Sequence, residues 1–173
     1  MSERSGAVTF KGNGVTLVGD EIKLDRPAPD FTATAVDMSA KKLSDYRGKV
    51  VILATMPSLD TPVCDIEAKR FNKDVGELGS DVVCLSLSMD LPFAQRRWCG
   101  AAGATNVTTL SDYKDHSAGK TLGLRIKELG LLARAVIIID KQGVVRYIDL
   151  VKEVTKEPDY AAAIAKAKEL AEA

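Results

Sequence analysis

Three apolar runs along the chain are nearly continuous rather than alternating with polar residues. They cover residues 50–56, 82–88 and 135–139 and are rich in valine, isoleucine and leucine. Runs of this length and composition are typical of strands that are buried on both faces of a sheet. A turn-forming segment, Asp140–Gly143, separates the third run from a further apolar stretch at 144–148. This spacing predicts an antiparallel hairpin beside the other strands.

Between the first two strands, the apolar positions change to a helical period. Thr61 and Pro62 form a start signal, because threonine caps helices and proline fits the first turn. The apolar positions that follow lie three or four residues apart: Ala68, Phe71, Val75 and Leu78. Gly79 is expected to end this helix.

Further helices are predicted at 90–103 and 114–123. The last helix is amphipathic, and its inner stripe consists of Tyr160, Ile164, Ala167 and Leu170.

The start of the chain reads as extended structure. The stretch from Val8 to Val18 contains Gly12-Asn13-Gly14, and Asn-Gly between β-type runs predicts a hairpin. A short strand is expected at 31–36 and a turn at 43–48. The order that results, a βαβ unit followed by a ββα unit, predicts an α/β protein with a thioredoxin-like fold. It would have a central mixed β-sheet flanked by helices, with an N-terminal β-hairpin.

Length, charge and hydropathy limit the number of domains and the classes of function that the chain can have. The 173 residues suit a single domain spanning 1–173. Lys and Arg together number 24, as do Asp and Glu, so the chain has no excess of positive charge that would favour binding to nucleic acid. The N-terminus lacks the apolar core of a signal peptide, and no run is long enough for a membrane span. We therefore expect a cytoplasmic protein without a membrane role, in a compartment that keeps thiols reduced.

The chain contains three cysteines, Cys64, Cys84 and Cys99, and one histidine, His116. Their spacing matches no metal-ligand pattern, so neither a metal nor a cofactor is expected. Cys84 lies inside a buried strand run and is interpreted as a core thiol. His116 is interpreted as a helix-surface or capping residue rather than a general base.

Cys64 is the thiol with the most distinctive position. With Thr61 as the cap, Cys64 is the third residue of the helix, where free N–H groups and the helix dipole favour a thiolate. It also continues the apolar stripe, and burial would oppose the charge unless a cation lay nearby. Position and period alone leave a reactive thiolate and an inert core thiol equally open. By the same measure, Thr61 could be an ordinary cap and Pro57 a strand terminator.

A motif that contains these residues favours a reactive thiolate over an inert core thiol. Pro57, Thr61 and Cys64 resemble the Pro-x-x-x-Thr-x-x-Cys motif of the peroxiredoxins. Four other segments resemble the bacterial thiol peroxidase branch of that family, the atypical two-cysteine group: Val8–Val18, Asp90–Gly103, Leu131–Val136 and Glu157–Tyr160. The resemblance covers nearly the whole chain, with its motifs in the family's order.

The resemblance implies a role for each matching residue. Cys64 would be the peroxidatic cysteine, and Cys99 the resolving cysteine that forms an intramolecular disulfide with it. Thr61 would orient the thiolate and the peroxide, Arg134 would stabilise negative charge, and Pro57 would shield the thiolate from water. The resemblance also implies thioredoxin as reductant, hydrogen peroxide and alkyl or lipid hydroperoxides as substrates, an antioxidant function and a homodimer.

Several points remain open at this stage. Without the resemblance, Cys99 lies one step off the apolar stripe of its helix and reads as a bystander. Two cysteines on separate helices are not expected within disulfide range, so local unwinding is predicted at Cys64 and in the helix of Cys99, eased by Gly100 and Gly103. Departures from the family pattern include Gly14 and the pairs Thr55-Met56 and Glu67-Ala68, none at a position expected to be catalytic.

Two other classes of function remain as alternatives. A thioredoxin-like disulfide reductase or isomerase would need a second cysteine close to Cys64, and the chain has Thr61 at that point of the motif. A redox sensor or binding protein would use Cys64 without turnover.

Overall fold

The computed structural model describes residues 1–173, and the three continuous apolar runs form its central strands: β5 (Val50–Thr55), β6 (Val82–Ser88) and β10 (Ala135–Ile139). Every residue of β5 and β10 is buried. β6 pairs parallel to β5, and β10 pairs antiparallel to it. The predicted mixed sheet is therefore confirmed.

The complete sheet has seven strands in the order β11-β10-β5-β6-β7-β3-β4. The outer strands are β11 (Val145–Leu150), β7 (Val107–Ser111), β3 (Thr32–Ala35) and β4 (Ala40–Lys42). The sequence patterns did not predict β7, whose five residues include three threonines and serines. Its place comes from pairing with β6 on one side and β3 on the other. Such long-range pairing is not visible in local periodicity.

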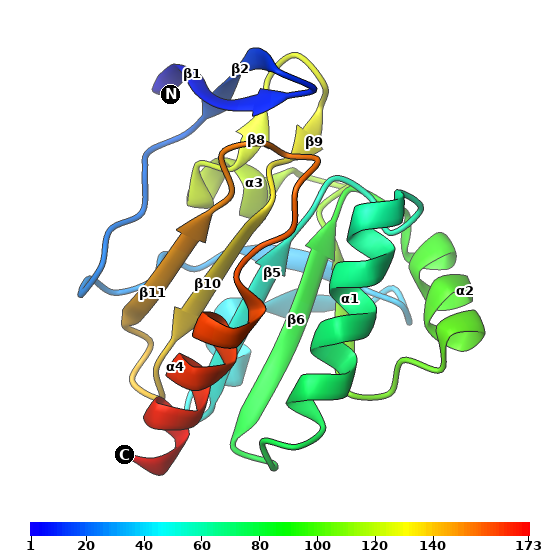
Figure 1. Cartoon of the computed structure of the whole chain (residues 1–173), viewed down its shortest axis with the longest axis vertical. Coiled ribbons are helices and arrows are strands. Elements are labelled where there is room, and N and C mark those ends of the chain that lie inside the picture. Colours follow the sequence, from blue (N-terminus) through cyan, green and yellow to red (C-terminus); the bar gives the residue numbers. More distant parts are fainter.

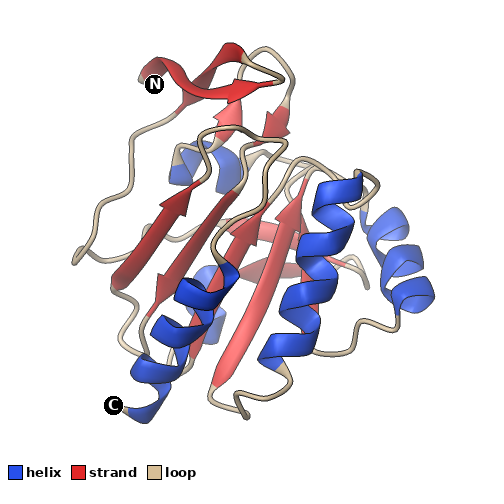
Figure 2. Cartoon of the chain, in the orientation of Figure 1, coloured by secondary structure: helices blue, strands red, loops and turns tan.

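Helices cover both faces of this sheet. In Figures 1 and 2, α1 (Pro62–Val75) and α4 (Tyr160–Glu172) lie side by side in front of the strands. Their apolar side chains pack on one face with alternate strand residues, and the other face carries the larger cluster of buried side chains. The remaining helices are α2 (Pro92–Ala102), α3 (Ser117–Leu122) and the short 3-10 helix η1 (Leu43–Tyr46). This arrangement confirms the thioredoxin-like α/β fold.

Two helix boundaries differ from the prediction by more than two residues. α1 ends at Val75 and is capped at Gly76, whereas Gly79 lies beyond the helix in the following loop with φ 82°. α3 begins only at Ser117, because His116 before it has a left-handed backbone with φ 55°. In both cases the prediction assigned to the helix several residues that the structure places outside it.

The predicted N-terminal hairpin is present as β1 (Glu3–Phe10) and β2 (Asn13–Val18). It joins β8 (Arg125–Ile126) and β9 (Leu131–Leu132) in a second, four-stranded sheet, seen at the top of Figure 1. β9 is separated from β10 only by Ala133 and Arg134. The second sheet therefore holds the segment that enters β10.

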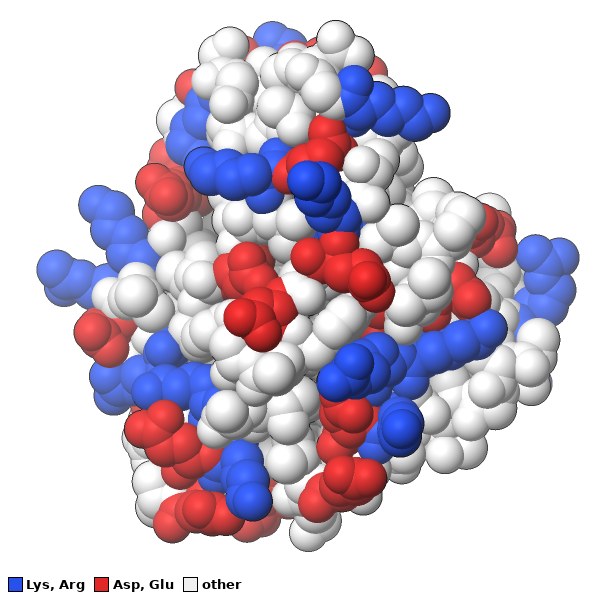
Figure 3. All heavy atoms as spheres, viewed as in Figure 1, with Lys and Arg blue, Asp and Glu red and all other residues white.

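Basic and acidic side chains are interspersed over the face shown in Figure 3, without a large area of one sign. None of the helices combines the length and apolar composition needed to cross a membrane.

Candidate active site

The carboxyl end of β5 leads into the segment that carries Cys64. Pro57 is buried just beyond this strand, and Thr61 caps α1. The backbone N–H of Cys64 donates to Thr61 Oγ1 at 3.4 Å, which confirms the predicted cap. Cys64 is 0% exposed and belongs to the apolar cluster under α1 and α4. The burial expected from its place on the apolar stripe is therefore complete.

Sheet register brings Arg134 to this thiol. Ala135 of β10 pairs with Thr55 of β5, so the residue before Ala135 emerges beside the end of β5. Arg134 Nη2 donates to Cys64 Sγ at 3.0 Å, and Nε donates to the carbonyl oxygen of Val154 at 2.9 Å. Arg134 is itself only 1% exposed. The cation that a buried thiolate at Cys64 requires is thus in direct contact with the sulfur.

Glu67 completes this buried group of charges, and the sequence interpretation missed it. Arg134 Nη1 donates to Glu67 Oε2, while Glu67 Oε1 has no hydrogen-bond partner. Burial raises the pKa of Glu67 to about 7, against the opposing effect of the Arg134 charge. Glu67 was interpreted as a departure from the family pattern without a role at the site. The signal was available, because an acidic side chain one turn after Cys64 faces the same buried side of the helix.

Arg134 remains protonated and positively charged in this environment. Burial acts to lower its pKa, but the Glu67 carboxylate and the Cys64 sulfur outweigh burial and raise the pKa above its ordinary value. A guanidinium also offers several donors in one plane, so a single side chain binds the sulfur and the carboxylate together. The site therefore contains a permanent positive charge shared between two acidic groups.

The hydroxyl of Thr61 donates to the carbonyl oxygen of Ser58 at 3.0 Å. The hydrogen bonds of the structure do not include one between this hydroxyl and Cys64 Sγ. Because the Thr61 hydroxyl donates its proton to Ser58, Thr61 Oγ1 can act only as an acceptor towards groups at the start of α1.

The loop before α1 is fixed by Asp90, which follows β6. Its carboxylate accepts from Ser58 Oγ at 2.6 Å and from the Leu59 N–H at 2.7 Å. The same carboxylate accepts from Ser88 Oγ at 2.7 Å, and Gln95 of α2 donates to that hydroxyl. This polar network connects the loop containing Pro57 and Thr61 with the beginning of α2.

The second candidate cysteine lies apart from this group. Cys99 is half-buried on α2, and its Sγ lies 3.6 Å from Thr109 Oγ1 of β7. All three cysteines are free. Cys84 is 1% exposed within β6, and burial raises the pKa of its thiol, as expected for a core residue. The structure thus brings together Cys64, Arg134 and Thr61, but not Cys99.

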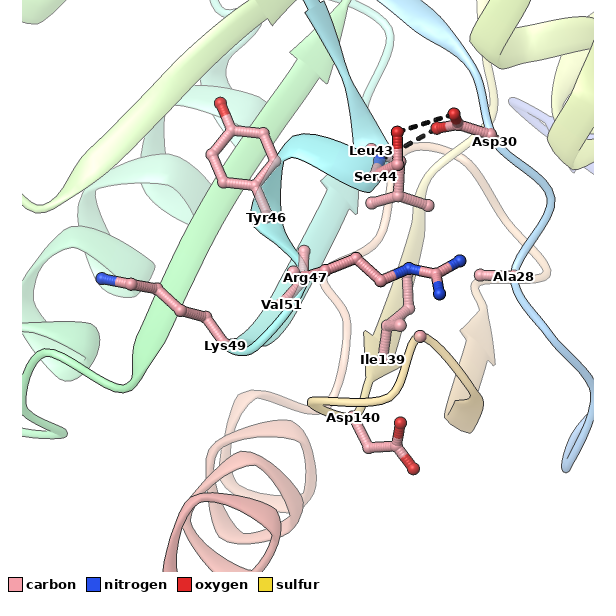
Figure 4. Close-up of a pocket in the computed structure, with 11 residues that line it drawn as sticks. Ala28, Asp30, Leu43, Ser44, Tyr46, Arg47, Lys49, Val51, Ile139 and Asp140 are labelled. Carbon is pink, nitrogen blue, oxygen red and sulfur yellow. Dashed lines mark hydrogen bonds between the residues drawn. The ribbon is translucent and has the colours of Figure 1, made fainter.

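His116 is located at the N-cap position of α3, where its Nδ1 contacts Arg125 Nη1 rather than the helix backbone. No group of three or more His, Cys, Asp and Glu side chains is close enough to hold a metal ion. A small hollow lies at the opposite, amino end of β5, lined by Asp30, Arg47 and neighbours (Figure 4). None of the candidate site residues lines it.

A thioredoxin-like fold with a buried cysteine at a capped helix start, in contact with an arginine, defines a class: the thiol-dependent peroxidases of the peroxiredoxin type. The family model "Redoxin" matches residues 23–164, and the chain belongs to this family.

Individual relatives are similar over almost their full lengths. A thiol peroxidase of Bacillus subtilis (strain 168) is 50% identical over 163 residues, covering 94% of this chain and 97% of that protein. A thiol peroxidase of Streptococcus pneumoniae (strain ATCC BAA-255 / R6) is 47% identical, covering 94% and 99%. The crystal structure of a peroxiredoxin-like protein from Aquifex aeolicus has a TM-score of 0.89 at 43% identity, covering 96% and 97%. These comparisons support thiol-dependent peroxidase activity for this chain.

Proposed function

We propose that the enzyme reduces hydroperoxides through Cys64, with Cys99 as the resolving cysteine and thioredoxin as the reductant. The observation that carries this proposal is the contact between Arg134 Nη2 and Cys64 Sγ, two buried groups 3.0 Å apart. An arginine in the core is costly unless it compensates negative charge. The Glu67 carboxylate supplies one such charge to Nη1, and a thiolate at Cys64 would supply the second to Nη2.

In the first step, the Cys64 thiolate attacks one oxygen of the hydroperoxide. A sulfur–oxygen bond forms, the O–O bond breaks, and the other oxygen leaves as alkoxide or hydroxide and takes a proton from water. Arg134 is placed to stabilise the developing negative charge. Thr61 Oγ1 is available to accept the hydroxyl proton of the peroxide, which would orient it towards the sulfur. The product is a sulfenic acid at Cys64.

In the second step, the Cys99 sulfur attacks the Cys64 sulfenic acid. A disulfide forms, and the hydroxyl group leaves as water with the proton of the Cys99 thiol. A dithiol such as reduced thioredoxin then restores both thiols by exchange. Because Cys99 Sγ lies against Thr109 while Cys64 Sγ lies against Arg134, the segments around both cysteines must move before the sulfurs meet.

Three exposed apolar side chains support the proposed homodimer. Ile66 lies just after the first turn of α1, and Leu91 and Phe93 lie at the start of α2; they are 52%, 51% and 68% exposed. Both helices begin after the carboxyl ends of the neighbouring strands β5 and β6, at the edge of the sheet that carries the site. A second copy of the chain would cover these side chains. Replacement of Phe93 by glutamate should then shift the mass measured by light scattering towards the monomer, and an unchanged mass would refute this interface.

The substrates are proposed to include hydrogen peroxide and organic hydroperoxides, and the location to be the cytoplasm. The cytoplasm keeps thiols reduced, as the resting state of this proposed cycle requires.

The test is peroxide-dependent NADPH oxidation coupled through thioredoxin reductase and thioredoxin. Wild-type protein should support turnover, and Cys64→Ser should abolish it. Cys99→Ser should form the sulfenic acid once and then stop, with sulfinic acid at Cys64 and no disulfide in mass spectrometry. Cys84→Ala is the matched control, because it removes a thiol that the mechanism does not use. Turnover that survives Cys64→Ser would refute the proposal.

A further inference from the structure

A single hydrogen bond connects the neighbours of the two cysteines. Trp98 Nε1 donates to Asp65 Oδ1 at 2.7 Å. Asp65 directly follows Cys64 in the first turn of α1, and Trp98 directly precedes Cys99 on α2. Any movement that joins the two sulfurs therefore acts on both partners of this bond.

The first turn of α1 is held less firmly than the loop before it. Upstream, Asp90 accepts two hydrogen bonds from Ser58 and Leu59 within a partly buried network. Inside the turn, the Asp65 N–H donates to the Thr61 carbonyl oxygen at 3.0 Å, but the bond that the Cys64 N–H donates to Thr61 Oγ1 is long, at 3.4 Å. The turn from Thr61 to Asp65 thus lies between the attachment at Asp90 and the bond to Trp98, and its Cys64 sulfur contacts Arg134.

Asp65 has one further partner, and it lies on the same helix. Lys69 Nζ lies 2.9 Å from Asp65 Oδ2, four residues along α1. That ion pair supports the helix but does not connect it to α2. The Asp65 side chain is 34% exposed, so both interactions are accessible to water and are made and broken without burying a charge. Only the bond to Trp98 links the two segments that must separate from their present neighbours.

We propose that the Asp65–Trp98 hydrogen bond is a latch that holds the first turn of α1 in the peroxide-reactive form and delays disulfide formation until it opens. This inference rests on the proposed function, because it concerns the step in which Cys99 attacks the Cys64 sulfenic acid and releases water. While the latch is closed, Cys64 Sγ remains in contact with the Arg134 guanidinium. Once it opens, the turn can unwind towards Cys99. Asp65 and Trp98 are positioning residues, since neither touches the reacting atoms.

A latch of this kind sets the balance between resolution and overoxidation. Removing it should raise the rate of disulfide formation about 5-fold, which corresponds to about 1 kcal/mol for one partly exposed charge-assisted hydrogen bond. The rate of the first step should stay within about twofold, because Cys64 still lies on Arg134 in most molecules. At high peroxide, the fraction of sulfinic acid at Cys64 should fall, because resolution competes with a second oxidation.

The variants separate the two interactions of Asp65. Trp98→Phe removes the latch and leaves the ion pair, whereas Asp65→Ala removes both. Lys69→Ala is the matched control, because it removes only the ion pair within α1. Asp65→Asn retains an oxygen that can accept from the indole and should restore near-wild-type resolution.

The experiment is a single-turnover reaction of reduced full-length protein with hydrogen peroxide, quenched at short times by acid and thiol alkylation. Mass spectrometry then quantifies sulfenic acid and disulfide. Trp98 is the only tryptophan, so in the variants that keep it, stopped-flow fluorescence follows the same transition beside Cys99. Faster resolution in Trp98→Phe and Asp65→Ala, with Lys69→Ala unchanged, is the expected result.

Resolution at the wild-type rate or slower in both latch variants would overturn the inference, as would equal acceleration in Lys69→Ala. The proposed function fails in a different way. If wild-type protein forms neither a Cys64 sulfenic acid nor a Cys64–Cys99 disulfide, the chemistry is wrong rather than the latch.

Discussion

Replacement of Glu67 by glutamine tests the electrostatics of the buried site. Glutamine has nearly the same shape and retains an oxygen that can accept from Arg134, but it cannot ionise. Glu67 has an ordinary pKa of 4.5, and burial raises it to about 7 in the folded protein. The folded protein therefore keeps a proton between these two values that the unfolded chain has already lost.

The sign of the effect follows from this difference. Because the folded state binds the extra proton, the contribution of Glu67 to stability is full below pH 4.5 and is lost as the pH rises to about 7. Across that window, the loss is about 3 kcal/mol, taken from the two pKa values at 1.36 kcal/mol for each pH unit. Glu67→Gln has no such loss. Its free energy of unfolding, relative to wild type, should rise by about 3 kcal/mol between about pH 4.5 and about pH 8.

Urea denaturation of the reduced proteins at a series of pH values measures this difference directly. Other carboxylates titrate in both proteins, so their effects cancel in the comparison. Glu77→Gln is the control, because it removes an exposed carboxylate close to the end of the same helix. A difference between Glu67→Gln and wild type that stays constant with pH would refute the reasoning. So would a difference that falls, rather than rises, between about pH 4.5 and about pH 8.

Three further substitutions test the positions of single residues. Thr61→Val should slow sulfenic acid formation at Cys64 about 100-fold in stopped-flow measurements and destabilise the protein by about 1 kcal/mol through the lost cap, whereas Thr61→Ser should retain most activity. Arg134→Lys should also lose about 100-fold in that rate, because an ammonium lacks the planar fork that serves the sulfur and the carboxylate together; a loss below about threefold would contradict this role. Gly19→Ala should cost at least about 2 kcal/mol in urea denaturation, because φ is 104° and an added Cβ would lie 2.1 Å from a backbone carbonyl oxygen. Gly79→Ala, at φ 82° but in open space, should cost clearly less, and equal losses would show that the close contact is not the cause.

Local patterns were sufficient for much of the fold. The runs that form β5, β6 and β10 are recognisable because strands buried on both faces have apolar residues at nearly every position. The start of α1 was recognisable from Thr61 and Pro62, since capping depends on neighbouring residues alone. In contrast, β7 was missed, because its Thr- and Ser-rich strand is stabilised by β6 and β3 rather than by its own composition.

At the site, the sequence by itself determined where Cys64 lies on α1, and its motif pointed to Arg134 as a partner. Only the tertiary structure decided that the two are in contact, because the pairing of β10 with β5 places them together across 70 residues of chain. It also decided that Glu67 shares the guanidinium. Local sequence specifies helix starts and buried strands through short-range hydrogen bonding and side-chain period. Charges far apart in the chain become partners only when sheet register brings them into the same buried, low-dielectric space.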